Sequence, residues 1–452
     1  MSRNHLYRSM PKTVEFLNNM SAIDMAGNNV VGPHTIYNLI PALTGLSFPN
    51  ELAATCWPKS DVEFDSCPWI FKNFSKAGYR TAYGENMAEW SMFTNGRAGF
   101  RVQPTDYYLQ PLLSLDENLK INHTKKECFG YRSESQLLIE YVSDFVTTMN
   151  SKIFFGFFLD ERLTYHEFNI HSDYDDIYFN FLQKHVESGH FNRTILIFLS
   201  DHGYRWGDIR KTFQGLHEQR NPFLFFMLPE GFKKKYNIAT SNMYNNSQRL
   251  ITAFDVHETL KDILNSETVL KNNVCLDRSL KIMKSVSLPR GISLFLPIPE
   301  SRTCSSAGIG DNLCLCQHME SLSINNRVVQ SLASLLLKYL SSLLSKYPEC
   351  SNMELLNVHS AWIHRQNKSI LQRQDEKIVD VKGEGDYLVD YTIIISTKPG
   401  AAMFEATYRY RPGSWRVLSS FQLVGDVQRI NKFYSQGYCI NDVMIKPFCY
   451  CK

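Results

Sequence analysis

The length, composition and charge of the chain exclude several classes of protein. Its 452 residues are too many for one small core, and 44% hydrophobic with 21% charged residues is ordinary for a globular protein. A net charge of +3 gives no reason to expect nucleic acid or an anionic membrane as partner. No stretch reaches the roughly 18 apolar residues of a membrane span, and the start MSRNHLYRSMPKTVEF lacks the apolar core of a signal peptide. The sequence does not indicate an oligomeric state.

The cysteines and the glycosylation sequons indicate the compartment. The cysteines, 11 in all, crowd toward the end of the chain, at Cys304, Cys314, Cys316, Cys350, Cys439, Cys449 and Cys451. Their Cys-x-Cys pairs are too tight for a zinc knuckle and favour a disulfide framework, although the odd total leaves one partner missing or free. Asn-x-Ser/Thr sequons lie at Asn19, Asn73, Asn122, Asn192, Asn245 and Asn367. We therefore predict a secreted protein, or one in the lumen of the secretory pathway.

Short apolar runs alternate with amphipathic stretches from about residue 20 to 300, which is typical of α/β proteins. The predicted strands are 29–31, 80–83, 153–159, 195–199 and 223–227. The predicted helices are 68–76, 134–149, 174–187 and 253–264. The last three strands are apolar on both faces, which favours central strands covered by helices.

The chain changes character after a connector rich in Pro, Ser and Arg at 288–306. A helix is predicted at 326–345, and strands at 391–396 and 406–410 with Lys398-Pro-Gly as a turn between them. We predict a large α/β domain over residues 1–300 and a smaller Cys-rich α+β region over residues 301–452.

The segment NRTILIFLSDHGYRWGD places Asp201 and His202 directly after a predicted strand. Polar residues there point into the crevice where open α/β sheets hold ligands. A carboxylate and an imidazole suit Zn²⁺, Mn²⁺ or a similar ion, and Gly203 permits a tight turn. The alternative is a helix-capping Asp beside a core His.

The segment NNVVGPHTIYNLIPALTG places Thr35 at the start of a helix. The helix dipole there stabilises an anion, and a metal or base can activate a hydroxyl as nucleophile. Asn38, one turn later, is a candidate donor to an oxygen of a phosphoryl or sulfuryl group. For an isolated Thr-x-x-Asn, a capping Thr and a surface Asn are the simpler interpretation.

Together these segments resemble a known superfamily. Thr35-Ile-Tyr-Asn38, followed by Thr44-Gly45, is similar to the Thr-x-Pro-Asn nucleophile motif of nucleotide pyrophosphatase/phosphodiesterases and sulfatases. The Asp201-His202-Gly203 segment resembles the paired metal-ligand motif of the same alkaline phosphatase superfamily. Over nearly the whole chain, further segments resemble an uncharacterised, sulfatase-like, Cys-rich animal family known as a domain of unknown function. They are CPWIFKNFSKAGYRTAYGEN, RGISLFLPIPESRTC and RINKFYSQGYCINDVMIKPFCYC.

The resemblance implies an alkaline-phosphatase-like fold, in which a mixed, mostly parallel sheet lies between helices. It implies one or two divalent metal ions (Zn, Mn or Ca) and an anionic ester substrate, a phosphate or sulfate on a small molecule, glycan or lipid. Thr35 is the implied nucleophile and a metal ligand beside Asp201 and His202, with Asn38 assisting.

The sequence departs from the family pattern at its start. Relatives open with a strand that ends in an acidic metal ligand, in this branch within a segment like Asp-Ser-x-Ser-Arg. The chain begins at Met1-Ser2-Arg3, as if inside that motif. We expect the strand, its Asp and any signal sequence to be missing, through an incomplete gene model or a true loss, and the 452-residue form to be inactive or nearly so. Tyr37 replaces the usual Pro, and Asn86 stands where the family often has Asp.

Other candidates follow the strand at 153–159 or lie in GLHEQRNP. The resemblance makes His166 a candidate metal ligand and makes Asn169, Arg205 and His217 candidate substrate contacts. Asp160 is a weaker candidate. For each, the simpler interpretation is a solvated polar side chain.

Two other functions stay open. A secreted, non-catalytic protein that keeps a hydrolase fold for binding is favoured by the missing strand and the Cys-rich tail. An intracellular redox or zinc-binding module rests on the cysteines alone, and the tight Cys-x-Cys pairs and the sequons speak against it.

Overall fold

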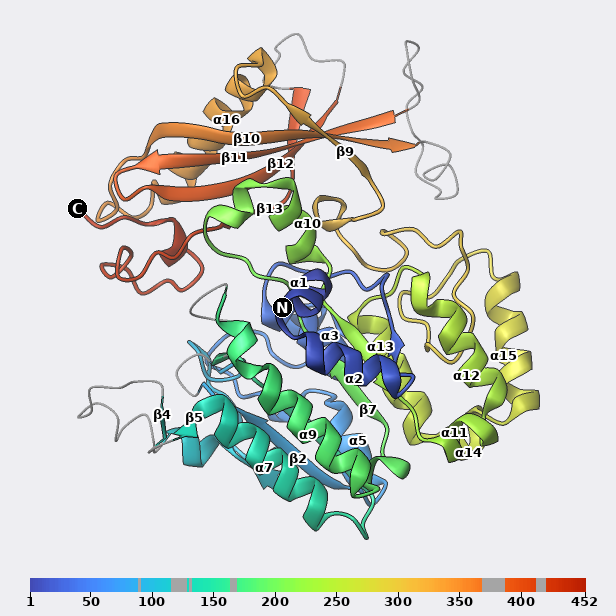
Figure 1. The fold of residues 1–452 in the computed structure, drawn as a ribbon. Coiled ribbons are helices and arrows are strands. Elements are labelled where there is room, and N and C mark those ends of the chain that lie inside the picture. Colours follow the sequence, from blue (N-terminus) through green and yellow to red (C-terminus); the bar gives the residue numbers. More distant parts are fainter. Residues whose placement is uncertain (88–90, 115–127, 130–131, 163–168, 368–386, 412–419) are drawn as a thin grey trace. The chain divides into compact units, whose positions relative to one another are not determined.

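The computed structural model describes residues 1–87, 91–114, 128–129, 132–162, 169–367, 387–411 and 420–452 (Figure 1). The chain forms two compact units. Unit 1 comprises Met1–Tyr204 and Asn221–Arg302, and unit 2 comprises Arg205–Arg220 and Thr303–Lys452. None of the helices within the described ranges is long and apolar enough to cross a membrane.

Unit 1 contains short strands and many helices. The strands are β1 (Ile23–Asp24), β2 (Arg80–Glu85), β3 (Tyr107–Tyr108), β4 (Cys128–Phe129), β5 (Arg132–Ser133), β6 (Phe154–Leu159), β7 (Leu196–Leu199) and β8 (Leu224–Met227). The helices are α1 (Arg3–Ser9), α2 (Pro11–Asn19), α3 (Thr35–Thr44), α4 (Asn50–Thr55), α5 (Ile70–Lys76), α7 (Glu134–Thr148), α9 (Asp175–Glu187), α11 (Glu230–Lys235), α12 (Asn237–Asn245), α13 (Ala253–Leu264), α14 (Ser266–Val269) and α15 (Asn272–Lys284). The predicted helices at 68–76, 134–149, 174–187 and 253–264 are confirmed as α5, α7, α9 and α13.

Six strands of unit 1 form two separate three-stranded sheets, and β4 and β5 form a third, two-stranded sheet. In the order β3-β2-β6, β2 pairs in parallel with both neighbours, whereas in the order β1-β8-β7, β8 is antiparallel to both. The predicted α/β class is confirmed. The single, mostly parallel sheet that was also predicted does not occur among the described residues. The reason is that β6 and β7, predicted as central strands, do not pair with each other in the described part of the chain.

The predicted strand at 29–31 is wrong. Val31 and Gly32 donate their backbone N–H groups to the Asn38 side chain (2.8 and 3.3 Å), so these groups are not available to a sheet. Nearby, Asn28 makes an isolated parallel bridge to Ile251. The segment is therefore a loop tied down by a side chain.

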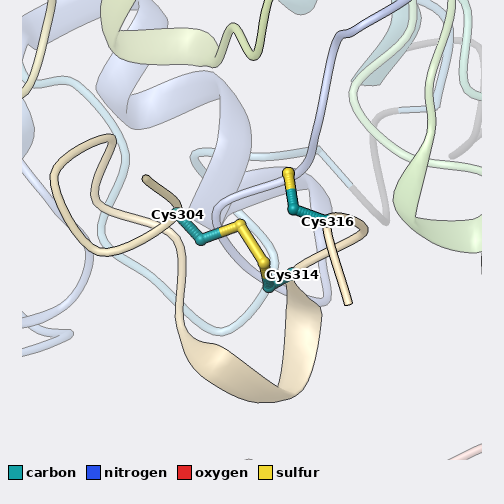
Figure 2. A group of neighbouring side chains, drawn as sticks. All are labelled: Cys304, Cys314 and Cys316. Carbon is teal, nitrogen blue, oxygen red and sulfur yellow. A yellow bond between two sulfur atoms is a disulfide. The ribbon is translucent and has the colours of Figure 1, made fainter. Parts of the chain in front are cut away.

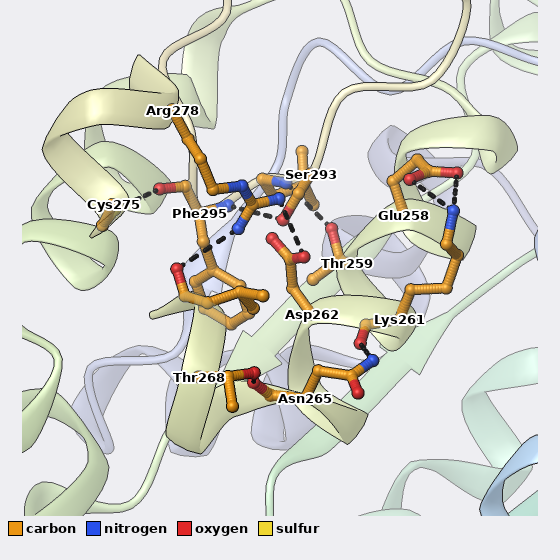
Figure 3. Close-up of polar contacts among 12 residues, drawn as sticks. Glu258, Thr259, Lys261, Asp262, Asn265, Thr268, Cys275, Arg278, Ser293 and Phe295 are labelled. Carbon is orange, nitrogen blue, oxygen red and sulfur yellow. Dashed lines mark hydrogen bonds and ion pairs between the residues drawn. The ribbon is translucent and has the colours of Figure 1, made fainter. Parts of the chain in front are cut away.

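Helix α13 is fixed at both ends by polar contacts. Thr252 and Asp255 form a capping box at its start, and the buried Asp255 carboxylate also pairs with Arg302 at 2.8 Å. Toward its end, Arg278 of α15 donates to Asp262 at 2.9 Å, and Thr259 accepts from the Leu294 backbone (Figure 3). Helix α13 also packs against α3, the helix that carries Thr35.

Unit 2 is built on one five-stranded antiparallel sheet in the order β13-β12-β11-β10-β9. Its strands are β9 (His318–Leu322), β10 (Glu354–Asn367), β11 (Tyr387–Lys398), β12 (Ala402–Tyr410) and β13 (Phe421–Arg429), and its helices are α10 (Phe213–Arg220) and α16 (Arg327–Leu344). Helix α16 buries Leu332, Leu336 and Leu340 in the core that covers this sheet. The predicted helix at 326–345 and the strands at 391–396 and 406–410 are confirmed as parts of α16, β11 and β12.

The cysteines of the tail are mostly paired, as predicted. The disulfides are Cys56–Cys67 in unit 1 and Cys304–Cys314, Cys350–Cys449 and Cys439–Cys451 in unit 2. The Cys316 thiol is free and lies beside the Cys304–Cys314 bond (Figure 2). Several disulfides in one chain suit an oxidising compartment.

Candidate functional site

The Thr35 hydroxyl lies at the first residue of α3. This helix forms because Ile36, Leu39, Ile40 and Leu43 recur on one buried face, and Gly45 ends it with a left-handed φ of 74°. The loop before it is tight: a Cβ on Gly32 would lie 2.2 Å from the Tyr37 Cβ, so only glycine fits there. The predicted position of Thr35 at a helix N-terminus is therefore what the structure shows.

Asn38 holds this loop in place. Its amide nitrogen donates to the carbonyls of Gly32 and His34 (2.9 and 3.1 Å), and its oxygen accepts from the Val31 and Gly32 amides. Both amide hydrogens of the buried side chain thus already have acceptors. In this arrangement Asn38 positions Thr35 by fixing the loop, and a direct bond from Asn38 to a substrate would require breaking one of these contacts.

Asp201 and His202 follow β7, and their side chains are 15% and 14% exposed, so solvent or a ligand still reaches them. His202 Nδ1 lies 2.7 Å from the Gly203 carbonyl oxygen. Because a carbonyl only accepts hydrogen bonds, Nδ1 carries the hydrogen and directs Nε2 to the opposite side of the ring. The Asp-His-Gly segment therefore fixes the orientation of the imidazole.

Thr35 and His202 meet although 167 positions separate them in the sequence. Thr35 Oγ1 lies 3.4 Å from His202 Nε2, and Asp201 Oδ2 lies 3.3 Å from the same nitrogen. A carboxylate oxygen and an imidazole lone pair are both acceptors, so their approach requires a proton or a cation between them. The three side chains predicted from two distant segments thus converge on one point.

The donor set fits a small metal ion. Ligand bonds of about 2.1 Å at a tetrahedral zinc place neighbouring donor atoms about 3.4 Å apart. The separations of 3.3 and 3.4 Å at His202 Nε2 match this spacing. An oxygen and a nitrogen ligand suit Zn²⁺ or Mn²⁺ better than Ca²⁺, whose bonds are longer. Asp201 and His202, with the Thr35 hydroxyl, would hold such an ion.

The charge of Asp201 is set by its surroundings. Burial raises the pKa of this carboxyl, but its electrostatic interaction with His202 and hydrogen bonds from Thr35 and the His202 backbone lower it below its usual value overall. Asp201 is therefore ionised at neutral pH and available as an anionic ligand. The Met1 nitrogen donates to Ser200 Oγ and to the His202 carbonyl (2.7 Å).

Asp160 does not join this group but anchors the end of β6. Its carboxylate accepts from Asn86 (2.6 Å), Ser135 (2.8 Å) and Tyr178 (2.8 Å). The Asn86 oxygen in turn accepts from the Glu161 backbone amide at 2.9 Å. An Asp at position 86 would set two carboxylates against each other, so Asn suits this network.

Among the other predicted site residues, His166 lies outside the described residues. Asn169 is exposed and precedes a short 3-10 helix (Ile170–Tyr174). Arg205 and His217 belong to unit 2, where the Arg205 guanidinium lies over the Trp206 ring and His217 is half-buried in α10. Burial, followed by the charge of Arg220, lowers the pKa of His217.

The cysteines form the only groups of three or more potential metal ligands in the described part of the chain. These groups are Cys304, Cys314 and Cys316, and Cys350, Cys439 and Cys449. Each contains sulfurs that are already in disulfides, which cannot bind zinc as thiolates. This observation weakens the interpretation of the tail as a zinc-binding module.

The sequence did not predict that Met1 lies beside Ser200 and His202. The Met1 amine lies against Ser200 and His202, and nothing in the polar run MSRNH indicates such a contact. The isolated bridge between Ser2 and Pro222 and the bond from Arg3 to the Asn221 carbonyl hold the segment there. Backbone pairing across this distance leaves no local pattern in the sequence.

Residues 1–359 match the family described as "Protein of unknown function (DUF229)". The prediction of an uncharacterised family of unknown function is thereby confirmed. A search among curated proteins gives no match.

Solved structures of phosphoethanolamine transferases are distantly similar. A lipooligosaccharide phosphoethanolamine transferase A from Neisseria meningitidis aligns at 12% identity and a TM-score of 0.37, over 57% of this chain and 50% of that chain. Its soluble domain aligns at 10% and 0.36, over 57% of this chain and 80% of that chain. A periplasmic domain of such a transferase from Campylobacter jejuni aligns at 11% and 0.34, over 58% and 86%. The alignment thus spans half the length of the first of these proteins.

Proposed function

The chain belongs to the DUF229 family, and from the geometry of its site we propose that it is a metal-dependent hydrolase of phosphate or sulfate esters with Thr35 as nucleophile. The observation that carries the proposal is the convergence of Thr35, Asp201 and His202. These are the residues through which the sequence resembles the alkaline phosphatase superfamily. The disulfides and sequons support a working place outside the cell or in the secretory lumen.

Each residue has a distinct task. Asp201 and His202 would hold a divalent ion, which would supply the positive charge that acidifies a bound hydroxyl and stabilises a substrate oxygen. Thr35 Oγ1 donates its hydrogen bond to Asp201, which directs the lone pairs of the oxygen away from the carboxylate. Thr35 Oγ1 loses its proton to solvent and forms a bond to phosphorus or sulfur as the bond to the leaving ester oxygen breaks, and that oxygen takes up a proton from solvent. Water then attacks the phosphorus or sulfur, which breaks the bond to Thr35 Oγ1 and frees the phosphate or sulfate. The dipole of α3 favours the anionic group at its N-terminus.

Two ligand side chains and one hydroxyl are a sparse set for a catalytic ion, because such sites commonly have three protein ligands. We therefore expect the 452-residue chain to bind Zn²⁺ or Mn²⁺ weakly. We expect its turnover of activated esters to lie far below the usual range of about 1–1000 per second. The sparse ligand set is also the observation that favours the alternative function, a secreted, non-catalytic binding protein.

Turnover of p-nitrophenyl sulfate and bis(p-nitrophenyl) phosphate with added Zn²⁺ or Mn²⁺ tests the proposal. Thr35→Ala is expected to remove the residual activity, and Thr35→Ser to retain part of it, because only the serine keeps a hydroxyl. Thr44→Ala is the control, since Thr44 lies at the other end of α3 and bonds to the Ile40 carbonyl. Ester turnover that is normal in rate and unchanged by Thr35→Ala would show that the nucleophile is wrong. Metal binding without turnover of either ester would favour the binding protein.

A further inference from the structure

Helix α15 presents an apolar stripe to solvent. Leu276, Leu280 and Met283 follow one another at spacings of four and three residues, so they lie on one face of the helix. They are 48%, 54% and 58% exposed, and Val286, just beyond the helix end, is fully exposed. Exposed apolar residues are normal when they are scattered singly, but a contiguous group marks an interaction site. These four residues are here called the α15 stripe.

The opposite side of α15 is fixed to unit 1. Cys275 is buried, Ile282 packs against the main core, and Arg278 pairs with Asp262 of α13 at 2.9 Å (Figure 3). Helix α15 also packs beside α12, at the edge of unit 1 in Figure 1. These contacts hold the helix in place with its stripe facing outward, so a partner reaches the stripe without a rearrangement of the fold.

Lysines accompany the α15 stripe. Lys281 and Lys284 lie in the last turns of the helix and Lys271 lies at its N-cap, and all three are exposed. Asp277 is the one acidic residue of the helix, so positive charge is in excess there although the charge of the whole chain is small. None of these lysines forms an ion pair with another residue that the structure describes, whereas Lys235 of α11 pairs with a neighbouring carboxylate. The helix therefore offers free cationic groups beside its apolar face.

This combination favours a phospholipid surface over a protein partner. A stable protein interface takes about 20–30 residues from each side, whereas the stripe consists of four residues on a single helix. An interfacial helix needs only apolar side chains that enter the boundary of the acyl chains and lysines that reach the phosphates. The 13 residues of α15 are too few to cross a bilayer, so the helix would lie flat on its surface.

We propose that α15 docks the protein onto the surface of a phospholipid bilayer. The α15 stripe enters the boundary of the acyl chains, and Lys281 and Lys284 contact anionic headgroups. This inference goes beyond the function proposed above and does not depend on it, because α15 carries none of the residues of the candidate site.

Sedimentation of the 452-residue chain with lipid vesicles tests the proposal. We expect binding to phosphatidylcholine vesicles that contain about 30% phosphatidylserine to be at least about tenfold tighter than to phosphatidylcholine alone, and to weaken as salt is added. No binding to the mixed vesicles, or equal binding to both kinds, would overturn the proposal.

Substitutions in the stripe test the apolar contact. Leu276→Ser with Leu280→Ser is expected to weaken binding to the mixed vesicles by at least about tenfold, because both side chains leave the acyl boundary. Both residues are exposed, so the variant should unfold at the same urea concentration as the wild type. Val443→Ser with Met444→Ser, which removes an equally exposed apolar pair from unit 2, is the control and should leave binding unchanged. An equal loss from both pairs would contradict docking through α15.

Charge reversals test the lysines. Lys281→Glu with Lys284→Glu should remove the preference for phosphatidylserine, whereas Lys338→Glu with Lys346→Glu, at exposed positions of unit 2, changes the net charge equally and should keep it. Loss of the preference in both variants would overturn the assignment to α15. A second copy of the chain is the other candidate occupant. A dimer that dissociates on Leu276→Ser with Leu280→Ser, without vesicle binding by the wild type, would assign the stripe to that copy and refute the proposal.

Discussion

The two units of the chain complete their sheets in different ways. In unit 2, five strands form one continuous antiparallel sheet, and disulfides close the chain around it. In unit 1, the longer strands β2, β6, β7 and β8 are divided between two separate three-stranded sheets, and β6 and β7 line a cavity. The carboxyl end of β7 carries Asp201 and His202, so the candidate site lies beside the break between these sheets. Unit 2 thus builds its core on one continuous sheet, whereas unit 1 carries the candidate site where its sheets are divided.

The largest expected effect is on the closure of unit 2. Cys350–Cys449 spans 99 positions, and Cys56–Cys67 in unit 1 spans 11. Chain entropy predicts a loss of about 4–5 kcal/mol for Cys350→Ser with Cys449→Ser. The matched pair Cys56→Ser with Cys67→Ser should lose about 3 kcal/mol. Urea unfolding of each variant measures the difference. Equal losses would mean that loop length does not govern the stability of the two units.

The next largest loss of stability is expected at a buried charge cluster in unit 2. Glu405 lies between Arg210 and Arg220 (3.0 Å to the latter), and all three side chains are buried. Burial raises the pKa of Glu405, but the two arginines lower it overall, so the carboxyl is charged in the fold. Glu405→Gln leaves two buried guanidinium groups without a counter-ion and should cost about 4 kcal/mol at pH 7. A change below about 1 kcal/mol in urea unfolding would show that this cluster is not important for unit 2.

A Glu-to-Gln substitution at the buried Glu85 of unit 1 should raise the free energy of unfolding, whereas Glu405→Gln in unit 2 should lower it. Burial of Glu85 raises its pKa to about 7, despite hydrogen bonds from Ser91 and the Met92 amide. Between about pH 4.5 and 7 the folded chain holds this proton and the unfolded chain does not, so the wild-type stability falls as pH rises. Glu85→Gln removes this loss and should gain about 2–3 kcal/mol relative to wild type between pH 4.5 and 8. Unfolding curves of the two proteins that stay parallel across this range would contradict the raised pKa.

Local patterns in the sequence predicted several of the elements, but not the loop at 29–31, and they pointed to the three converging residues. The apolar runs at 153–159 and 195–199 form strands because burial drives them, and Asp201 and His202 were found because polar residues follow such a run. The sequence could not predict which strands β6 and β7 pair with, since pairing depends on what lies beside each strand in space. Asn38 was predicted to donate to the substrate, whereas in the structure its amide bonds to the Gly32 loop. That contact could not be predicted because it has no signature in the sequence.

The most direct test of the proposed metal site is a crystal of the chain soaked with Zn²⁺ and measured at the zinc absorption edge. We predict an anomalous peak about 2.1 Å from both His202 Nε2 and the Asp201 carboxylate. The peak should disappear in Asp201→Asn and persist, weakened, in Thr35→Ala. A peak at Cys316 or at surface histidines with none between Asp201 and His202 would contradict the account.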